Sequence, residues 1–252
     1  MLIQADALAL PTPYYSHAGI TIFCADCRDI LPSLKADVVI TDPPYGIGDA
    51  PIQGQDRTGK RVGGVNVWHP DSTWDAEINP EWCGMVCVAA PVVAWFGHWR
   101  KRNMVEDAMP HLLRAEIVWA KDCHVGPPCP VAMRDERIWI FSASGVSPST
   151  FETSVWDEPI IPTWEYKHHK NQKPERLMRR LIAWMPPGLI LDPFMGSGTT
   201  LVAAKQLRRR AIGIEIEEKY CAIAVQRLQQ EVLPLESVAP EPAQADLLGD
   251  AS

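Results

Sequence analysis

The chain has 252 residues, of which 46% are hydrophobic and 22% charged; this composition argues against a disordered chain and fits a globular protein with a sizeable core. No basic stretch precedes an apolar one at the N-terminus, and the longest apolar run, residues 85–96, is too short to cross a membrane, so we expect a cytoplasmic protein. The formal net charge is −7, but the last 22 residues carry five acids and no Lys or Arg; the remainder has 26 acids against 24 bases, which does not exclude nucleic-acid binding.

Alternating strands and helices begin near the N-terminus. The apolar patterns predict a strand at residues 20–24, a short helix at 28–34 and a buried strand at 38–41. Residues 46–76 are rich in Gly, Asp and Asn and have no period, which predicts a long mobile loop of the kind that often serves as a functional lid.

The alternation continues to residue 230. The expected elements are strands at 92–96, 116–120, 137–141, 189–191 and 211–216, and helices at 101–113, 175–185, 199–207 and 217–230. Residues 142–166 have no period and are expected to be irregular. Strands alternating with helices imply an α/β fold with a doubly wound, mostly parallel sheet, and such sheets bind ligands at the carboxyl ends of their strands.

A chain of this length fits one α/β domain with loop insertions, which we place at residues 1–230. Residues 231–252 are rich in Pro, Ala and acids and are expected to form a disordered tail. The bases gather at residues 100–102, 167–180 and 208–210. Such clusters either bind phosphate or form solvated helix faces, and we expect the second role for at least one of them.

The seven cysteines are an odd number in a chain expected in a reducing compartment, so we expect free thiols. Cys24 and Cys27 have C-x-x-C spacing, and Cys123, His124 and Cys129 would complete a zinc site on paper. The second half of this set lacks the spacing of metal ligands, so no metal is predicted.

A glycine-rich turn, DPFMGSGTT at residues 192–200, follows one of the expected strands. Gly196 and Gly198 permit a tight turn and close approach of the backbone to a ligand, and Glu215 ends the next strand, where a βαβ unit places an acceptor for ribose hydroxyls. A structural turn capped by Asp192 is the alternative. The full G-x-G-x-x-G pattern and a phosphate loop are missing, which favours S-adenosylmethionine over a dinucleotide or ATP.

A second turn, Asp42-Pro43-Pro44-Tyr45, follows the strand expected at residues 38–41. Two consecutive prolines fix φ and stop the strand, and the residue before a proline is held extended. The result is a rigid corner that presents a carboxylate, a carbonyl and an aromatic ring. A sharp turn at a strand end would explain the prolines, but not the Asp and Tyr on either side of them.

Together, LDPFMGSGTT, TDPPYG and GIEIEEKYCAIAVQRL resemble the amino-DNA methyltransferases, which act on adenine N6 or cytosine N4. The resemblance covers residues 20–230, and the order of the motifs, with TDPPYG first, is similar to the β-type permutation of that family. It implies a Rossmann-like, S-adenosylmethionine-dependent methyltransferase sheet and a DNA substrate.

The resemblance also assigns site residues. ITIFCADCRDILPSL resembles the segment whose acid, here Asp26, meets the adenine of the cofactor, and HKNQKP resembles the HxTQKP segment, with Lys173, that helps to hold its methionine end. Asn171 replaces the usual Thr, which leaves that residue's part open. The whole set is, for catalysis, Asp42, Pro43, Pro44 and Tyr45, and, for the cofactor, Asp26, Lys173, Asp192, Phe194, Gly196, Ser197, Gly198, Thr199 and Glu215.

In this interpretation the amino group of the base donates hydrogen bonds to the Asp42 carboxylate and the Pro43 carbonyl, while Tyr45 stacks on the ring. These contacts localise the nitrogen lone pair and stabilise the developing charge. A base in double-stranded DNA must be flipped out to reach the corner. Residues 46–76 and 142–166 are the expected DNA-binding insertions; the second is short, so target recognition is either limited or shared with the second subunit of a homodimer.

Three alternatives stay open. The Asp that opens the tetrapeptide favours adenine N6, but the family also contains cytosine N4 enzymes, in which Ser is commoner at that place. RNA, protein glutamine and small molecules are other acceptors, although glutamine-directed relatives usually carry Asn-Pro-Pro-Tyr. The last alternative is a catalytically silent DNA-binding protein that keeps the fold.

Overall fold

The computed structural model describes residues 10–44, 78–122, 134–143, 151–161 and 172–230, together with the backbone of two short paired strands, β4 (Gly54–Gln55) and β5 (Arg61–Val62). Tyr45, most of the loop predicted at 46–76 and the tail predicted at 231–252 lie outside the described residues.

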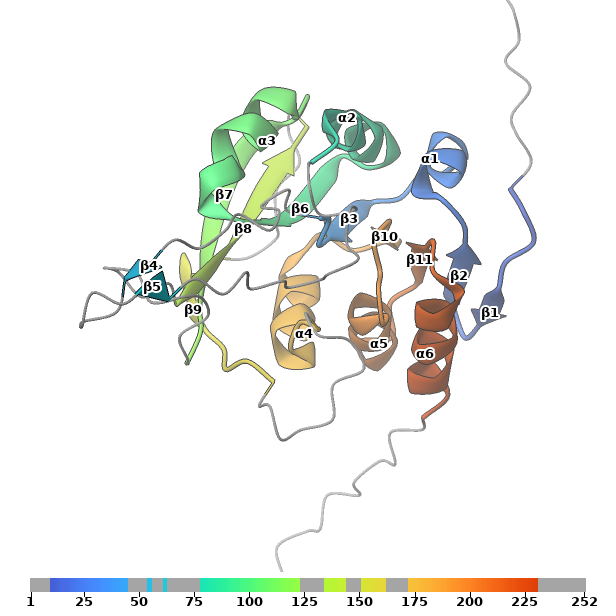
Figure 1. Cartoon of the computed structure of the whole chain (residues 1–252). Helices are drawn as coiled ribbons and strands as arrows, with labels where there is room; N and C mark the ends of the chain where they lie inside the picture. Colours follow the sequence, from blue (N-terminus) through green and yellow to red (C-terminus); the bar gives the residue numbers. More distant parts are fainter. Residues whose placement is uncertain are drawn as a thin grey trace, which may run out of the picture.

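A nine-stranded sheet forms the centre of the molecule, with the strand order β1-β2-β11-β10-β3-β6-β8-β7-β9 (Figure 1). Neighbours are parallel from β2 to β6 and between β7 and β9, and antiparallel at β1 and on both sides of β8. The predicted doubly wound, mostly parallel α/β sheet is therefore confirmed. The strands are β1 (Tyr15–His17), β2 (Ile20–Cys24), β3 (Val38–Thr41), β6 (Val92–Gly97), β7 (Leu112–Ala120), β8 (Asp135–Ser142), β9 (Val155–Asp157), β10 (Ile190–Asp192) and β11 (Ala211–Glu215).

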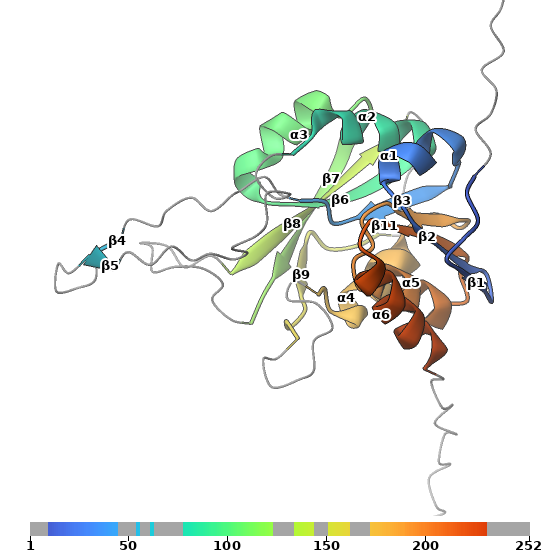
Figure 2. The ribbon, with the colours of Figure 1, turned by 45° about the vertical axis from the view of Figure 1, so that its right-hand side comes forward.

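Helices cover both faces of this sheet. In Figure 1, α1, α2 and α3 lie above the sheet and α4, α5 and α6 below it, and Figure 2 shows the same two layers from another side. Among the described residues, no helix is long and apolar enough to cross a bilayer. The helices are α1 (Cys27–Ile30), α2 (Pro80–Ala89), α3 (Arg102–Ala108), α4 (Glu175–Trp184), α5 (Thr199–Gln206) and α6 (Glu218–Gln229), with short 3-10 turns η1 (Leu31–Ser33) and η3 (Trp99–Lys101).

Two apolar layers lie between the sheet and its helices. All four residues of β3 are buried, because the strand is covered on both faces. Val38 and Ile40 belong to the core beneath α4, α5 and α6, whereas Val39 belongs to the core beneath α1, α2 and α3. This alternation follows from the two-residue period of a strand, and it explains why β3 is a continuous apolar run in the sequence.

The connections leave two neighbouring strands toward opposite faces. From β10 the chain passes through α5 to β11, and from β3 it passes through α2 to β6, so that the two crossover helices lie on opposite sides of the sheet (Figure 1). Such a topological switch point is where open α/β sheets bind ligands, beyond the carboxyl ends of the strands.

One predicted helix is wrong in its second half. The helix expected at 101–113 is α3, which ends at Ala108, and β7 already begins at Leu112. Pro110 is the reason, because a residue before a proline avoids the helical region, and Met109 is extended with φ −90° and ψ 115°.

Besides the paired strands β4 and β5, which lie within the loop predicted at 46–76, the sequence patterns miss the helix α2 and the strands β9 and β1. The helix α2 overlaps the apolar run at 85–96, and it has no clear amphipathic period to mark it as a helix; Pro91 separates it from β6. The strand β9 lies within residues 142–166, so the prediction of irregular structure is wrong there. Both β9 and the edge strand β1 have three residues, too few to show a period.

Candidate active site

The carboxyl ends of five parallel strands meet at one edge of the sheet. Because β10 pairs with both β3 and β11, the two motifs that lie far apart in the chain become neighbours at the switch point. Residues predicted for the reaction and for the cofactor therefore share one edge. The polar side chains there are Asp26 after β2, Glu215 on β11, Asp192 on β10, Asp42 after β3 and His98 after β6.

The predicted reaction corner begins directly after β3. The side chain of Asp42 is 29% exposed, whereas Pro43 is buried against the molecule, so the carboxylate stands at the boundary between protein and solvent. Its Oδ2 accepts a hydrogen bond of 2.7 Å from Nζ of Lys173, which lies just before α4. Tyr45 lies outside the described residues, so its stacking on a base stays a prediction.

Lys173 belongs to a row of four alternating charges. Its Nζ lies 2.7 Å from Asp42 and 2.7 Å from Oε1 of Glu136, and Oε2 of Glu136 lies 2.7 Å from Nζ of Lys121. Nζ of Lys173 also lies 5.1 Å from the centre of the Phe96 ring. The row assembles at the carboxyl edge because β8 is antiparallel to β6 and β7, so that its first residues meet the ends of those strands.

The charged forms of Glu136 and Lys173 are stabilised within this row. Burial by itself raises the pKa of Glu136, but the neighbouring charges of Lys173 and Lys121 outweigh it and lower the pKa to about 2. Burial likewise disfavours the charged form of Lys173, yet Asp42 and Glu136 together hold its pKa above the ordinary value. The sequence assigned Lys173 to the cofactor, and no motif indicated the pairing with Glu136.

Asp192, at the end of β10, has a different environment from Asp42. Its side chain is buried, and it accepts hydrogen bonds from Oγ1 of Thr200 at 2.5 Å and from the backbone N–H of Phe194 at 3.2 Å. Burial raises the pKa of Asp192 to about 7; the nearby Asp42 carboxylate acts in the same direction, and the two hydrogen bonds oppose it. Asp192 therefore holds the turn after β10 together.

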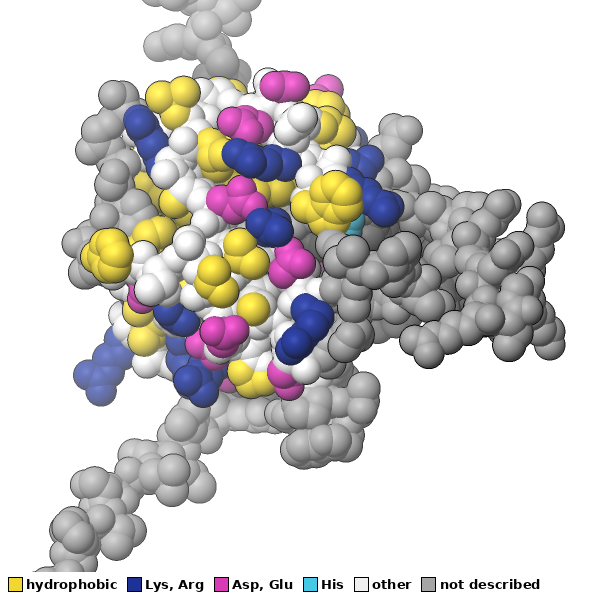
Figure 3. Space-filling model, turned by 90° about the vertical axis from the view of Figure 1, so that its left-hand side faces the viewer, with side chains coloured by type: hydrophobic (Ala, Val, Ile, Leu, Met, Phe, Trp, Pro, Cys, Tyr) yellow, Lys and Arg dark blue, Asp and Glu magenta, His cyan; other side chains and the backbone are white. Residues whose placement is uncertain are grey.

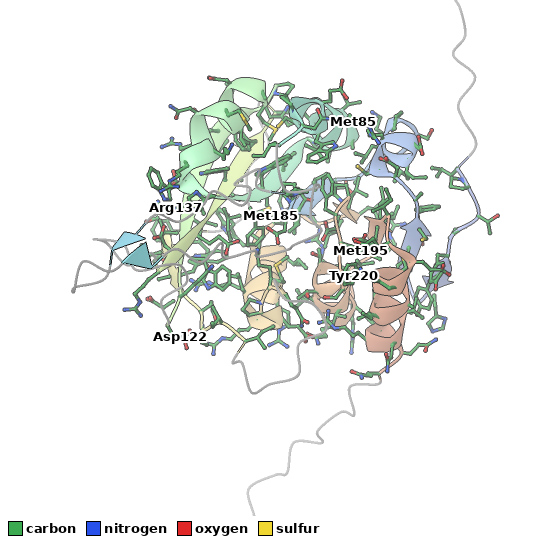
Figure 4. The ribbon with its side chains drawn as sticks, viewed as in Figure 1. Met85, Asp122, Arg137, Met185, Met195 and Tyr220 are labelled. Carbon is green, nitrogen blue, oxygen red and sulfur yellow. The ribbon has the colours of Figure 1, made fainter. Side chains whose placement is uncertain are left out.

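The glycine turn between β10 and α5 has two left-handed residues. Gly198 has φ +78°, and a Cβ there would lie 2.7 Å from Cβ of Ala224, so α6 packs directly against it. Gly196 has φ +51°, and a Cβ there would meet nothing within 4 Å. Gly198 thus serves packing, whereas Gly196 leaves space beside the turn. Figure 4 shows Met195 at this turn, between the end of β10 and the start of α5.

Glu215 faces the same turn from the end of β11. Its carboxylate accepts hydrogen bonds from the backbone N–H groups of Gly196, at 3.1 Å, and of Glu217, at 2.8 Å. Burial raises the pKa of Glu215, and these hydrogen bonds oppose the rise. The next side chain, Ile216, is 66% exposed although it is apolar. An anchored carboxylate beside an apolar surface suits a ribose with an attached base.

Arg227 of α6 supports the turn from behind, and sequence reasoning missed it. The guanidinium is 4% exposed and donates to the backbone carbonyl of Ser197 at 2.6 Å and to Oγ1 of Thr199 at 3.1 Å. It also pairs with Glu175 of α4 at 2.8 Å. The only signal was a basic residue on the helical face that carries Ala224 and Leu228, which are both buried.

Three further residues border this region: Phe194, Trp82 and Asp26. Phe194 is half-buried, and its ring meets that of Trp82 of α2 edge to face, with 4.9 Å between centres. Trp82 had no motif of its own, because α2 itself was missed. Asp26 caps α1, and its carboxylate is paired with Arg28, whose hydrogen bonds lower the pKa of Asp26. It follows β2, the neighbour of β11 at the sheet edge.

The predicted basic clusters divide into different roles. Arg102 pairs with Glu106 and Glu116, and Arg209 donates hydrogen bonds to backbone carbonyls at the end of α4. These two arginines therefore stabilise the fold. On the face shown in Figure 3, basic and acidic side chains alternate. Arg100 is different, because its guanidinium lies 5.4 Å from the ring centre of Trp99, which is 49% exposed.

The cysteines do not gather into a site in the part of the chain that the structure describes. Cys24 and Cys27 are free thiols, and the described ranges contain no group of His, Cys, Asp and Glu that could hold a metal ion. Cys123, His124 and Cys129, the other half of the zinc set considered above, lie outside these ranges.

Comparison with known proteins identifies relatives along most of the chain. A family model described as DNA methylase, for N6 and N4 methyltransferases, matches residues 36–226. The YubD protein of Escherichia coli (strain K12) is 30% identical over 218 residues, which cover 81% of this chain and 87% of that protein. The DNA adenine methyltransferase YhdJ of the same organism is 26% identical over 245 residues, 79% of this chain and 78% of that one.

Solved structures share the fold. The M1.HpyAVI complex with SAM superposes with a TM-score of 0.61 at 24% identity, covering 82% of this chain and 99% of that one. The cytosine-N4-specific PvuII DNA methyltransferase superposes with a TM-score of 0.63 at 16% identity, covering 88% and 90%. The fold is thus shared with an enzyme whose name gives cytosine N4 as its target.

Proposed function

The chain belongs to the N6/N4 DNA methylase family, and from this premise we propose that it transfers the methyl group of S-adenosylmethionine to the N6 amino group of adenine in double-stranded DNA. The observation that supports this most is the position of Asp42. It stands at a proline-fixed corner after β3, directly beside the strand that leads into the glycine turn.

The residues around the glycine turn suit the donor. S-adenosylmethionine supplies a methyl group that its sulfonium already activates, so the protein has to bind and orient it. In the proposed arrangement Glu215 accepts hydrogen bonds from the ribose hydroxyls, and each carboxylate oxygen can accept more than one. Ile216 offers an apolar surface for the adenine, and Asp26 an acceptor at the next strand end. Gly196 leaves room beside the turn.

The acceptor binds at the corner after β3. The lone pair of an exocyclic amino group is delocalised into the base, and this makes the nitrogen a weak nucleophile. In the proposed mechanism its two N–H groups donate to the Asp42 carboxylate and to the Pro43 carbonyl, which hold the nitrogen in place and stabilise positive charge as the methyl group arrives. The Tyr45 ring, by its place in the motif, stacks on the base.

Adenine is favoured over cytosine by the first residue of the corner. This chain has Asp42 where Ser is commoner in the cytosine N4 enzymes, and the relative YhdJ is named a DNA adenine methyltransferase. The fold does not separate the two, because the PvuII enzyme shares it. The choice of adenine therefore rests on the corner itself.

DNA reaches this edge next to the end of β6. Trp99 and Arg100 follow that strand, which is the neighbour of β3, and they combine an exposed ring with a positive charge. Basic side chains attract backbone phosphates, and exposed aromatic rings insert where a nucleobase leaves the stack. The insertions predicted to bind DNA lie largely outside the described residues, and the homodimer stays a prediction.

The test is methylation of unmethylated genomic DNA by the purified protein with isotope-labelled donor, followed by mass spectrometry of the nucleosides. We expect labelled N6-methyladenine. Labelled N4-methylcytosine as the sole product would contradict the choice of base, and transfer to RNA but not to duplex DNA would contradict the substrate. Sequencing that detects the modified base would then give its sequence context.

A further inference from the structure

Four charged side chains from four separate segments form one buried row behind the reaction corner. Lys121 follows β7, Glu136 lies on β8, Lys173 precedes α4 and Asp42 follows β3. Each step of the row is an N–O distance of 2.7 Å. The exposed fraction of the side chain is 12%, 9% and 11% for the first three and rises to 29% at Asp42. The row thus leads from the interior to the corner.

Stability alone does not explain this row. Removing charges from water is unfavourable, and buried ion pairs are often no more stable than apolar packing of equal volume. Lys173 contacts a carboxylate on each side, and its Nζ lies over the Phe96 ring. Its position is therefore determined from two directions, and so is the position of the Asp42 oxygen that it contacts.

We propose that Lys173 and, acting through it, Glu136 and Lys121 are positioning residues for the reaction carboxylate: they hold the Asp42 carboxylate oriented toward the amino group of the base. This inference rests on the proposed function, since it assigns Asp42 the acceptor role. It differs from the role that the sequence motif suggested for Lys173, in which the lysine holds the methionine end of the donor.

The charged and titratable groups described near Asp42 come from several elements. Lys173 contacts it directly, and Asp192 on β10 is a second carboxylate close enough for the two to repel. Behind Lys173 stand Glu136 and Lys121. His98 also faces this end of the row, but burial and the nearby charges of Arg100 and Lys121 lower its pKa, against the pull of Glu136 and Asp135.

The contacts in the row predict losses of different size for two substitutions. Lys173→Met removes the group that contacts the Asp42 carboxylate, so Asp42 is no longer held toward the amino group and kcat falls most. Glu136→Gln leaves the contact between Lys173 and Asp42 in place but removes the charge on the other side of the lysine, so kcat falls less.

The experiment measures kcat, donor affinity and thermal stability of the full chain for Lys173→Met, Lys173→Arg, Lys121→Met and Glu136→Gln. We expect at least about a tenfold loss of kcat for Lys173→Met, partial rescue of kcat by Lys173→Arg, and a smaller loss for Lys121→Met. Donor affinity should stay near that of the unsubstituted protein in all four.

Glu158→Gln is the matched control. Glu158 is a buried carboxylate 3.0 Å from Arg176 and 3.6 Å from Arg180. Both arginines lie on α4, and neither belongs to the row behind Asp42. Its loss should lower stability without lowering kcat. The proposal is overturned if Lys173→Met weakens donor binding about tenfold while kcat at saturating donor is unchanged, or if Lys173→Arg is no more active than Lys173→Met.

Failure of the proposed function is separable from failure of this inference. The split between kcat and donor affinity does not depend on which base is methylated, so kcat is measured on whichever product the nucleoside analysis identifies. If the protein transfers no methyl group to DNA, the ¹³C chemical shift of the Asp42 carboxyl still tests the contact with Lys173. Lys173→Met must change this chemical shift, and an unchanged value overturns the inference.

Discussion

Asp42 and Asp192 occupy equivalent places on neighbouring strands but have opposite surroundings. Each stands where a short buried strand ends, each is followed by a proline, and β3 and β10 are adjacent and parallel. Asp42 is partly exposed and paired with a lysine. Asp192 is buried, is bound by a hydroxyl and a backbone N–H, and has a pKa raised to about 7 by burial.

The difference shows that the Asp-Pro pattern determines a shape but not a role. The proline holds both aspartates extended at a strand end. A lysine pairs with one of them at the boundary with solvent, whereas the other closes a turn. In the proposed function Asp42 marks the acceptor end of the site and Asp192 the donor end, and the following substitutions separate them.

The largest effect is expected at the acceptor end. Asp42→Ala removes the hydrogen-bond acceptor for the amino group and should lower kcat by about 10²- to 10³-fold or more. Donor affinity should change little, because Glu215 and the glycine turn remain intact. Single-turnover methylation of DNA and calorimetric binding of S-adenosylmethionine measure the two quantities. A variant with full activity would show that the reaction site lies elsewhere.

A matched pair of glycine substitutions tests the donor end. Gly198→Ala combines a left-handed φ with a contact of 2.7 Å to Cβ of Ala224, so the free energy of unfolding should fall by about 2 to 4 kcal/mol. Gly196→Ala meets no neighbour, so only the strain of its φ remains, about 1 to 2 kcal/mol.

The order of the two glycine variants should be reversed for donor binding, which Gly196→Ala should weaken more than Gly198→Ala. The methyl group of Gly196→Ala enters the space beside the turn, so this variant should bind S-adenosylmethionine more weakly than its loss of stability explains. Urea unfolding without donor and calorimetric titration with donor distinguish the cases. Equal loss of stability in both variants would mean that the packing of Gly198 against α6 does not matter.

The smallest effect concerns the charge of Asp192. Because its pKa is raised in the folded protein, the folded state holds a proton that the unfolded state releases, and stability falls as the pH rises from about 4 toward 7. The side chain of Asp192→Asn can still form hydrogen bonds with Thr200 and with the backbone N–H of Phe194, but it cannot titrate. The stability of the unsubstituted protein relative to this variant should therefore fall by about 1 to 2 kcal/mol between pH 5.5 and 7.

Urea unfolding of the two proteins at several pH values measures this difference. A difference that is independent of pH would show that folding does not change the protonation of Asp192. The comparison between the two aspartates would then lose its electrostatic part and keep only the difference in burial.

The glycine turn could be predicted because its parts are close together in the chain. Asp192, Gly196, Gly198 and Glu215 lie within 24 residues, and strand, turn, helix and strand each leave a local pattern. The sequence does not predict the helix α2, because burial leaves it without a clear amphipathic period, and Trp82 on this helix is missed for the same reason. The helix at 101–113 was extended too far because its apolar pattern continues across Pro110.

The sequence by itself determined the fold class, the rigid corner and the glycine turn, because sterics of proline and glycine and the periods of strands and helices act between near neighbours. Only the tertiary structure decided which partners the corner has. Lys173 is 131 residues from Asp42, and Glu136 and Lys121 come from two further segments. Charge compensation depends on distance through space, and that distance is fixed by the order of strands in the sheet, which no local pattern encodes.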